Sequence, residues 1–157
     1  MEAILRELSY GWTDDTIQES DELYGSFFDE IIRGIRNEVG FQWISLYWVR
    51  ETDGSLEEVA IPEHGFNMIN DIQFENGNGL AAWVAKYQRP IILRYVHRGH
   101  RFRSNPIKSF MCVPIIWEGK TKGVVNLGHI KPNHYTNTGL KRLLSFFELF
   151  FTDRILA

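Results

Sequence analysis

Hydrophobic side chains recur at helical spacing near both ends of the chain. In the first stretch, about residues 21–39, the apolar stripe consists of Tyr24, Phe27, Phe28, Ile31, Ile35 and Val39. A spacing of three and four residues predicts a helix that packs one side against a core. Ser20 before this stretch and Gly40 after it are typical of helix boundaries. A second helical pattern covers about residues 138–155.

Two hairpins are predicted between these helices. The β-rich runs 41–50 and 55–61 are joined by a short turn that contains Asp53-Gly54. The runs 107–117 and 121–130 flank a second turn with Gly119 at its centre. The first strand is apolar on both faces, which indicates that both of its faces are covered.

The segment between the hairpins predicts two further elements. A short helix over residues 80–88 is stopped by Pro90, and a short strand follows at 90–93. Residues 94–106 then form a long loop, and long loops in compact domains are often functional. The order of elements predicts an α+β fold, with an antiparallel sheet and both terminal helices on one face.

The last helix carries more hydrophobic residues than one packing face needs. Leu140, Leu143, Leu144, Phe147 and Phe151 form one stripe, and Phe146, Leu149 and Phe150 widen it. A helix that is apolar over most of its circumference is buried on more than one side. We therefore expect a homodimer through the terminal helices, the commonest symmetric solution.

Length and charge restrict the class of protein. The 157 residues fit a single domain, here residues 1–157, with 1–15 as a lead-in segment. A net charge of −3 gives no global attraction to nucleic acid. No apolar run reaches the length that spans a bilayer, and the first residues lack the pattern of a signal peptide. We therefore expect a cytoplasmic protein with neither nucleic acid nor membrane as a partner.

Candidate reactive residues are few. Cys112 is the single cysteine, so the chain has neither an internal disulfide nor a four-cysteine zinc site. The five histidines lack carboxylate or cysteine partners at ligand spacing, and no metal site is predicted. No phosphate-binding loop and no nucleophile–base pair can be argued from spacing. We expect no catalytic residues.

Several segments taken together resemble a GAF domain. They are Gly79–Ala85 with Arg89–Ile92, Ser109–Ile115 with the turn at Gly119, and Gly123–Leu127. The resemblance covers about residues 17–156. It implies a six-stranded antiparallel sheet related to the PAS fold, with the terminal helices on one face and a loop-covered pocket on the other. Members of the family bind cyclic nucleotides, haem, bilins or small metabolites, and many have no known ligand.

The family's ligands and activities fit this sequence unequally. The asparagine–lysine–phenylalanine–aspartate–glutamate signature of cyclic-nucleotide-binding members is absent. Cys112 precedes Val113-Pro114 in a strand, unlike a bilin-attachment cysteine. Free methionine sulfoxide reductases share the fold but resolve a catalytic disulfide with several cysteines, which one cysteine cannot do. No cofactor can therefore be named.

Candidate ligand-binding residues gather on the second hairpin. Phe110 and Cys112 share one strand face, which the alignment of the turn glycines with the family directs toward the pocket. Asn126 on the partner strand needs hydrogen-bond partners from the backbone or from a ligand. Cys112 is either an inert buried thiol or a sensing thiol.

Three residues outside the hairpin complete the candidate site. Trp83 is either an apolar wall of the pocket or a core residue. Arg101 and Arg103 in the long loop are suited to a carboxylate or phosphate at the pocket rim, or are solvated charges. An anionic or mixed polar–aromatic small molecule is the expected ligand.

The sequence thus leads to one function and two alternatives. We expect a regulatory, sensory domain of a signalling protein that binds a small molecule, mediates dimerisation, or does both. We also expect it to be linked to an effector domain in a longer protein. The first alternative is a ligand-free dimerisation module whose pocket is filled by its own aromatic side chains. The second is a methionine sulfoxide reductase, which the single cysteine disfavours.

Overall fold

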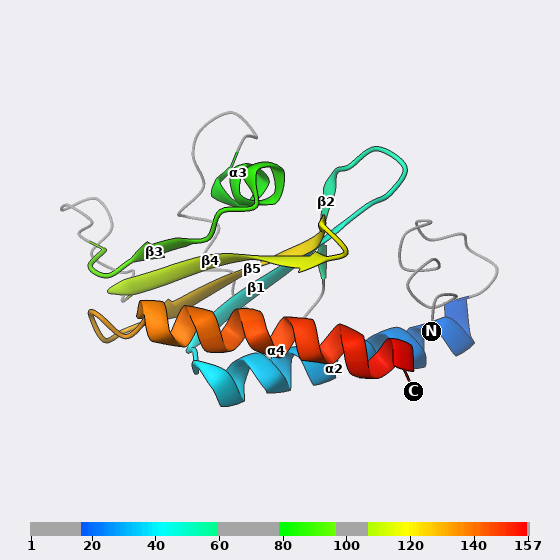
Figure 1. The fold of residues 1–157 in the computed structure, drawn as a ribbon, viewed down its shortest axis with the longest axis horizontal. Helices are drawn as coiled ribbons and strands as arrows, with labels where there is room; N and C mark the ends of the chain where they lie inside the picture. Colours follow the sequence, from blue (N-terminus) through cyan, green and yellow to red (C-terminus); the bar gives the residue numbers. More distant parts are fainter. Residues whose placement is uncertain (1–16, 60–78, 97–106, 157) are drawn as a thin grey trace.

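The computed structural model describes residues 17–59, 79–96 and 107–156, and these form three layers. A twisted antiparallel sheet lies in the middle (Figure 1). Two long helices, α2 (Ile17–Glu38) and α4 (Asn137–Leu156), run along one face of the sheet. The short helix α3 (Leu80–Tyr87) lies over the opposite face. We refer to these two surfaces of the sheet as the α2/α4 face and the α3 face.

The sheet has five strands in the order β2-β1-β5-β4-β3. Their bounds are Trp43–Val49 for β1, Leu56–Val59 for β2, Ile91–Leu93 for β3, Ser109–Trp117 for β4 and Lys120–His129 for β5. Both predicted hairpins are present, and β5 joins them by pairing with β1 on one side and β4 on the other. The expected six strands are thus five in the described residues, and 60–78 lie outside these.

The hairpin turns adopt the conformations that their residues favour. Glu118 and Gly119 have φ values of 50° and 75°, so both central residues of the β4–β5 turn are left-handed. Such a turn matches the twist of the two strands that it joins. Gly54 in the first hairpin also has a positive φ of 73°.

The predicted helices are present, with one difference at a boundary. Helix α2 begins at Ile17, so Ser20 lies inside it and does not cap it. The apolar stripe, which starts at Tyr24, thus begins several residues after the start of the helix. The other end agrees: Gly40 has a φ of 65°, and its N–H donates to the Arg36 carbonyl at 3.1 Å. Thr136 caps α4 by accepting from the Gly139 N–H at 3.1 Å.

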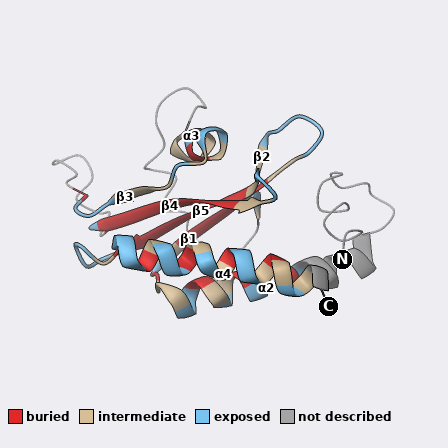
Figure 2. Ribbon diagram, viewed as in Figure 1, coloured by how far each residue is buried: buried red, intermediate tan, exposed pale blue. Residues whose placement is uncertain are grey.

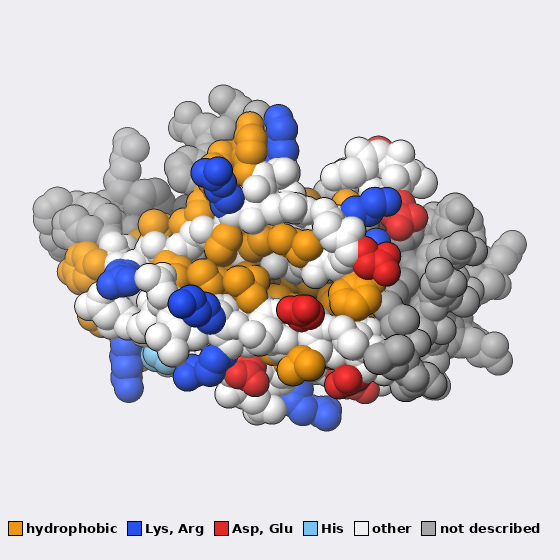
Figure 3. Space-filling model, in the orientation of Figure 1, with side chains coloured by type: hydrophobic (Ala, Val, Ile, Leu, Met, Phe, Trp, Pro, Cys, Tyr) orange, Lys and Arg blue, Asp and Glu red, His pale blue; other side chains and the backbone are white. Residues whose placement is uncertain are grey.

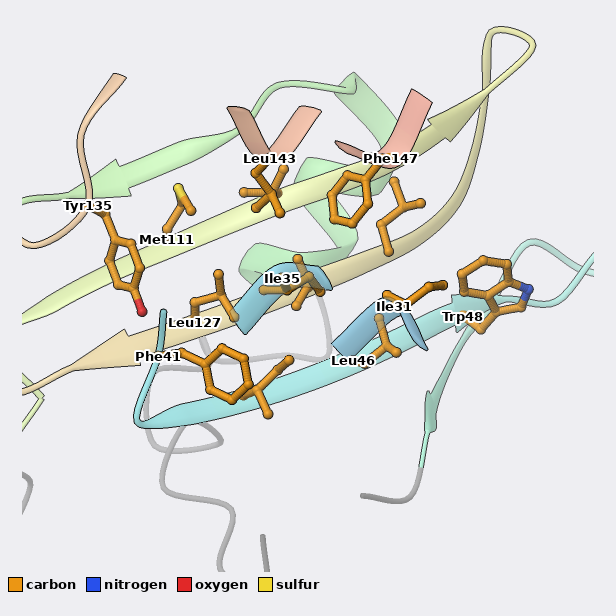
Figure 4. Packing of buried hydrophobic residues seen from close by; sticks show 14 of the residues in the cluster. Ile31, Ile35, Phe41, Leu46, Trp48, Met111, Leu127, Tyr135, Leu143 and Phe147 are labelled. Carbon is orange, nitrogen blue, oxygen red and sulfur yellow. The ribbon is translucent and has the colours of Figure 1, made fainter. Parts of the chain in front are cut away.

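The main core lies between the sheet and the two long helices. The sides of α2 and α4 that face the sheet are buried, and their outer sides are exposed (Figure 2). Figure 4 shows Ile31 and Ile35 of α2 and Leu143 and Phe147 of α4 directed toward strand residues such as Leu127. Burial of these side chains is the dominant favourable contribution to folding.

Part of the wide apolar surface of α4 is covered by α2 within one chain. Phe146 lies against Gly34 of α2, where a Cβ would overlap its ring. The Phe150 ring meets the ring of Phe27 edge-on at 5.4 Å. Leu149 is 61% exposed. The second buried side that suggested self-association is therefore supplied by α2, and the homodimer stays a prediction.

Among the described helices, none is both long and apolar enough to cross a membrane.

Candidate functional site

The α3 face of the sheet carries the predicted hairpin residues. Phe110 and Cys112 belong to a buried cluster that is separate from the main core, together with Val84 of α3 and Val124 of β5. Their neighbours Met111 and Val113 point to the α2/α4 face. Phe110 and Cys112 therefore share one face of β4, as strand alternation predicted.

A polar row crosses the α3 face. Asn126 of β5 pairs with Cys112 of β4 on one side and with Ser45 of β1 on the other. Directly paired residues in an antiparallel sheet share a face, so the three side chains lie in one line. Ser45 is also buried, with 2% of the residue exposed. Sequence reasoning missed Ser45, because it depends on the pairing of β1 with a strand far along the chain.

The Asn126 side chain is the unusual member of this row. Only 6% of the residue is exposed, and its Oδ1 atom has no hydrogen-bond partner among the described residues. A buried polar atom without a partner costs about 1–3 kcal/mol. The sequence left open whether the backbone or a ligand satisfies Asn126, and the described backbone does not satisfy Oδ1.

Helix α3 is fastened over this face at its C-terminal end. The Thr121 hydroxyl donates to the Ala85 carbonyl at 2.7 Å, and Gln88 Nε2 donates to the Gly119 carbonyl at 2.9 Å. Gln88 ends the helix in a left-handed conformation, with a φ of 56°. These bonds fix the C-terminal end of α3 to the β4–β5 turn.

The thiol of Cys112 is buried in the α3-face cluster. Burial raises its pKa well above the ordinary value, because the thiolate loses the solvation that it has in water. The thiolate is the nucleophilic form of cysteine. The structure thus favours the inert thiol of the two readings that the sequence allowed.

We expect Cys112 to react with a water-soluble disulfide reagent at least about tenfold more slowly in the folded domain than in urea. The physical reason is that burial and the raised pKa both withhold the thiolate. Absorbance of the released thiol measures both rates, and the same chain in urea is the control. Equal rates would show that the α3 face opens readily.

Of the remaining predicted site residues, the structure describes Trp83, which is not part of this cluster. Trp83 is 43% exposed and contacts Tyr87 one helical turn later, with ring centroids 5.2 Å apart. Hydrophobic side chains beside basic ones stand out over α3 in Figure 3. Arg101 and Arg103 lie outside the described residues, as does the expected cover at 64–75.

The two ends of the long loop are anchored on the α3 face. Val96 and Ile107 are both buried in the cluster with Phe110. The Val96 N–H donates to the Lys108 carbonyl at 2.7 Å. The described residues on either side of 97–106 therefore lie at the edge of the candidate site. Within the described ranges, no group of three or more His, Cys, Asp or Glu side chains is placed to hold a metal ion.

Comparison of the sequence with family models gives one family. The model described as GAF domain matches residues 21–147, which is most of the chain. The three-layer α+β arrangement agrees with that match. The chain belongs to the GAF domain family, as its sequence resemblance predicted. No curated protein matches the chain in sequence.

Solved structures with the same fold come from several kinds of protein. The GAF domain of a two-component sensor histidine kinase from Bacillus halodurans has a TM-score of 0.60 and 14% identity, over 84% of this chain and 95% of that one. An NreA protein of Staphylococcus aureus, mutated in its nitrate binding site, has a TM-score of 0.56 and 20% identity, over 78% and 96%.

A third solved structure is an enzyme. The type II free methionine-R-sulfoxide reductase of Thermoplasma acidophilum has a TM-score of 0.51 and 14% identity, over 79% of this chain and 91% of that one. At these identities the likeness establishes the fold alone. Function is a property of the sites placed on a fold, and these sites differ among proteins that share it.

Proposed function

We propose that this GAF domain is a regulatory module that binds a small molecule on the α3 face of its sheet and has no enzymatic activity. The observation that carries the proposal is the unpartnered Oδ1 atom of Asn126, buried in a row between Ser45 and Cys112. A buried acceptor is stabilised by any ligand that donates to it. The hydrogen bond from the ligand therefore stabilises the bound domain relative to the ligand-free domain.

The surroundings of Asn126 define the chemistry of the ligand. An amide oxygen accepts hydrogen bonds, so the ligand offers an N–H or O–H donor at this point. Phe110 and Val124, which are buried on the same face, suit an apolar or aromatic portion. A bare acceptor such as nitrate does not satisfy Oδ1. If Arg101 and Arg103 lie at the rim of the site, the ligand also carries an anionic group for them to bind.

The same strands link the ligand to the helices. Asn126 lies between Val125 and Leu127, and Cys112 between Met111 and Val113. All four neighbours pack in the core against α2 and α4. Since packed cores are not continuously deformable, a shift of β4 or β5 on binding is passed to the helices. The likeness to a sensor-kinase GAF domain supports a signalling output of this kind.

Two observations argue against a reductase. The chain has a single cysteine, so the disulfide that would turn the enzyme over cannot form within it. That cysteine is fully buried, and its pKa is raised by burial. A domain that binds methionine sulfoxide without reducing it would still fit the proposal.

The test begins with a thermal-shift screen of metabolites that carry N–H or O–H donors, with nitrate as the probe for a bare anion. For a compound that binds, Asn126→Leu is expected to weaken affinity about tenfold, which corresponds to 1.4 kcal/mol. Calorimetry measures the affinity. Without ligand, Asn126→Leu should be at least as stable as the parent protein, because the variant lacks the unpaired acceptor Oδ1.

Trp83→Leu is the matched control, since it changes an exposed residue in the same layer outside the cluster. Its affinity should equal that of the parent if Asn126 carries the binding. Unchanged affinity in Asn126→Leu would refute the site. A purified protein that retains no molecule in native mass spectrometry and binds nothing in the screen would favour the ligand-free module.

A further inference from the structure

Two histidine rings stack where three elements meet. His129 ends β5 and His134 lies in the loop before α4; their ring centroids are 3.7 Å apart and their planes are within 9° of parallel. The Tyr135 ring meets His134 edge-on at 4.8 Å, and the Tyr135 hydroxyl donates to the Gly40 carbonyl at 3.2 Å. The stack therefore lies between the end of the sheet, the start of α4 and the end of α2.

Hydrogen bonds fix where each neutral ring holds its proton. His129 Nδ1 accepts from the Lys131 N–H at 3.0 Å, so the proton of neutral His129 is on Nε2. His134 Nε2 lies 2.8 Å from the Val39 carbonyl oxygen, which can only accept, so His134 donates from Nε2. His134 thus binds the chain just beyond α2.

The two rings differ in what a second proton does. A proton on His134 Nδ1 leaves the bond from Nε2 to the Val39 carbonyl in place. A proton on His129 Nδ1 takes the position that the Lys131 N–H occupies. It also places a cation against His134. Burial, then His134, then Lys131 lower the pKa of His129 below its ordinary value.

The charged groups of the adjoining elements do not offset the lowering of the His129 pKa. Arg36 and Glu38 lie in the last turn of α2, and Arg142 of α4 donates to the Glu38 carbonyl at 2.9 Å. Lys108 precedes β4, and its N–H donates to the His129 carbonyl at 2.8 Å. Gln42, before β1, is neutral. Among the bonds within the described residues, none joins a carboxylate to either ring.

We propose that the His129–His134 stack is a proton-operated latch that joins the end of α2 to the loop before α4. The latch is closed while His129 is neutral, and it opens when His129 takes up a proton on Nδ1. It responds to acid independently of any ligand on the α3 face, so the inference does not rest on the proposed function. Opening would release the loop from Val39 and loosen the helical layer at this end.

The direction of the pH effect follows from His129. A histidine whose pKa is lowered in the folded state contributes stability that is complete above its unfolded pKa of about 6.5. That contribution is lost as the pH falls through the lower, folded value. The melting temperature is therefore expected to fall between about pH 6.5 and pH 5 more than it would without the latch.

Two conservative variants test the latch. His129→Asn keeps an acceptor near the Nδ1 position for the Lys131 N–H but does not titrate, so it should match the parent at pH 8 and lose part of the acid-induced fall. His134→Gln keeps a donor near the Nε2 position for Val39 and removes the neighbouring charge. In that variant the pKa of His129, measured by NMR, should rise toward 6.5.

The three histidines outside the described residues are retained in both variants and provide a common background. An equal acid-induced fall in His129→Asn and the parent would overturn the proposal. So would a pKa of His129 at or above 6.5 in the parent protein, a measurement that needs no variant. An unchanged pKa of His129 in His134→Gln would also overturn it, because the stack would then carry no coupling.

Discussion

Phe151→Ala is expected to lower the free energy of unfolding by about 3–5 kcal/mol, the usual cost of emptying a buried aromatic site. Phe151 is 1% exposed and lies in the last part of α4. Its ring stacks on Trp117 of β4 at 5.5 Å and contacts Phe27 of α2 at 6.4 Å. One side chain thus holds both long helices to the sheet, and chemical denaturation monitored by circular dichroism measures its loss.

Leu149→Ala is the matched control for this change. It removes a large apolar side chain from the same helix two positions earlier, but Leu149 is mostly exposed. A surface change of this kind stays within about 0.5 kcal/mol. A loss in Leu149→Ala as large as that in Phe151→Ala would show that the exposed side of α4 is covered, as it would be in the homodimer predicted from the sequence.

Gly123→Ala is expected to cost about 1–3 kcal/mol, the range for forcing extra volume into a packed core. Gly123 lies in β5 opposite Trp48 of β1 and Ile115 of β4. A Cβ there would lie 2.6 Å from the Tyr47 carbonyl oxygen and 2.7 Å from Cε3 of Trp48. The carbonyl belongs to β1 and the Trp48 ring is packed against Phe27 and Phe28, so neither can give way readily. Thermal denaturation measures the effect.

Gly25→Ala separates this steric effect from the general effect of replacing a glycine. Gly25 lies in α2, and a Cβ there meets nothing within 4 Å. Alanine favours a helix over glycine by about 0.8–1 kcal/mol, so this variant should be more stable than the parent. A stable Gly123→Ala protein would mean that β1 and β5 are less closely paired than the structure has them.

Local sequence patterns predicted most of the fold. The hairpin around Gly119, the stripe from Phe27 to Val39 and the stop at Gly40 all depend on residues close together in the chain. Contacts between distant segments were predicted less well. The sequence did not show that α2 covers part of the broad apolar surface of α4, where Phe146 packs on Gly34. Periodicity shows that a face is buried but does not identify its partner.

The candidate site shows the same division. Phe110, Cys112 and Asn126 were placed on one face from strand alternation and the register of a single hairpin. Ser45 completes their row only because β1 pairs with β5, which local spacing does not reveal. Trp83 lies beside the buried Val84, but its own side chain is exposed. Helix α3 has only 8 residues, and so short a helix has too few apolar positions to predict which of its sides faces the sheet.

The position of β5 in the centre of the sheet has a consequence for biosynthesis. β1 is made early, yet its longer partner is β5, and β2, α3, β3 and β4 are made between them. Closing so long a loop costs entropy before any contact is gained, and it slows folding. Until β5 emerges from the ribosome, Ile44, Leu46 and Trp48 of β1 have no complete core to enter. The domain is thus expected to fold only near the end of its synthesis, and its first hairpin is the segment that a chaperone would protect.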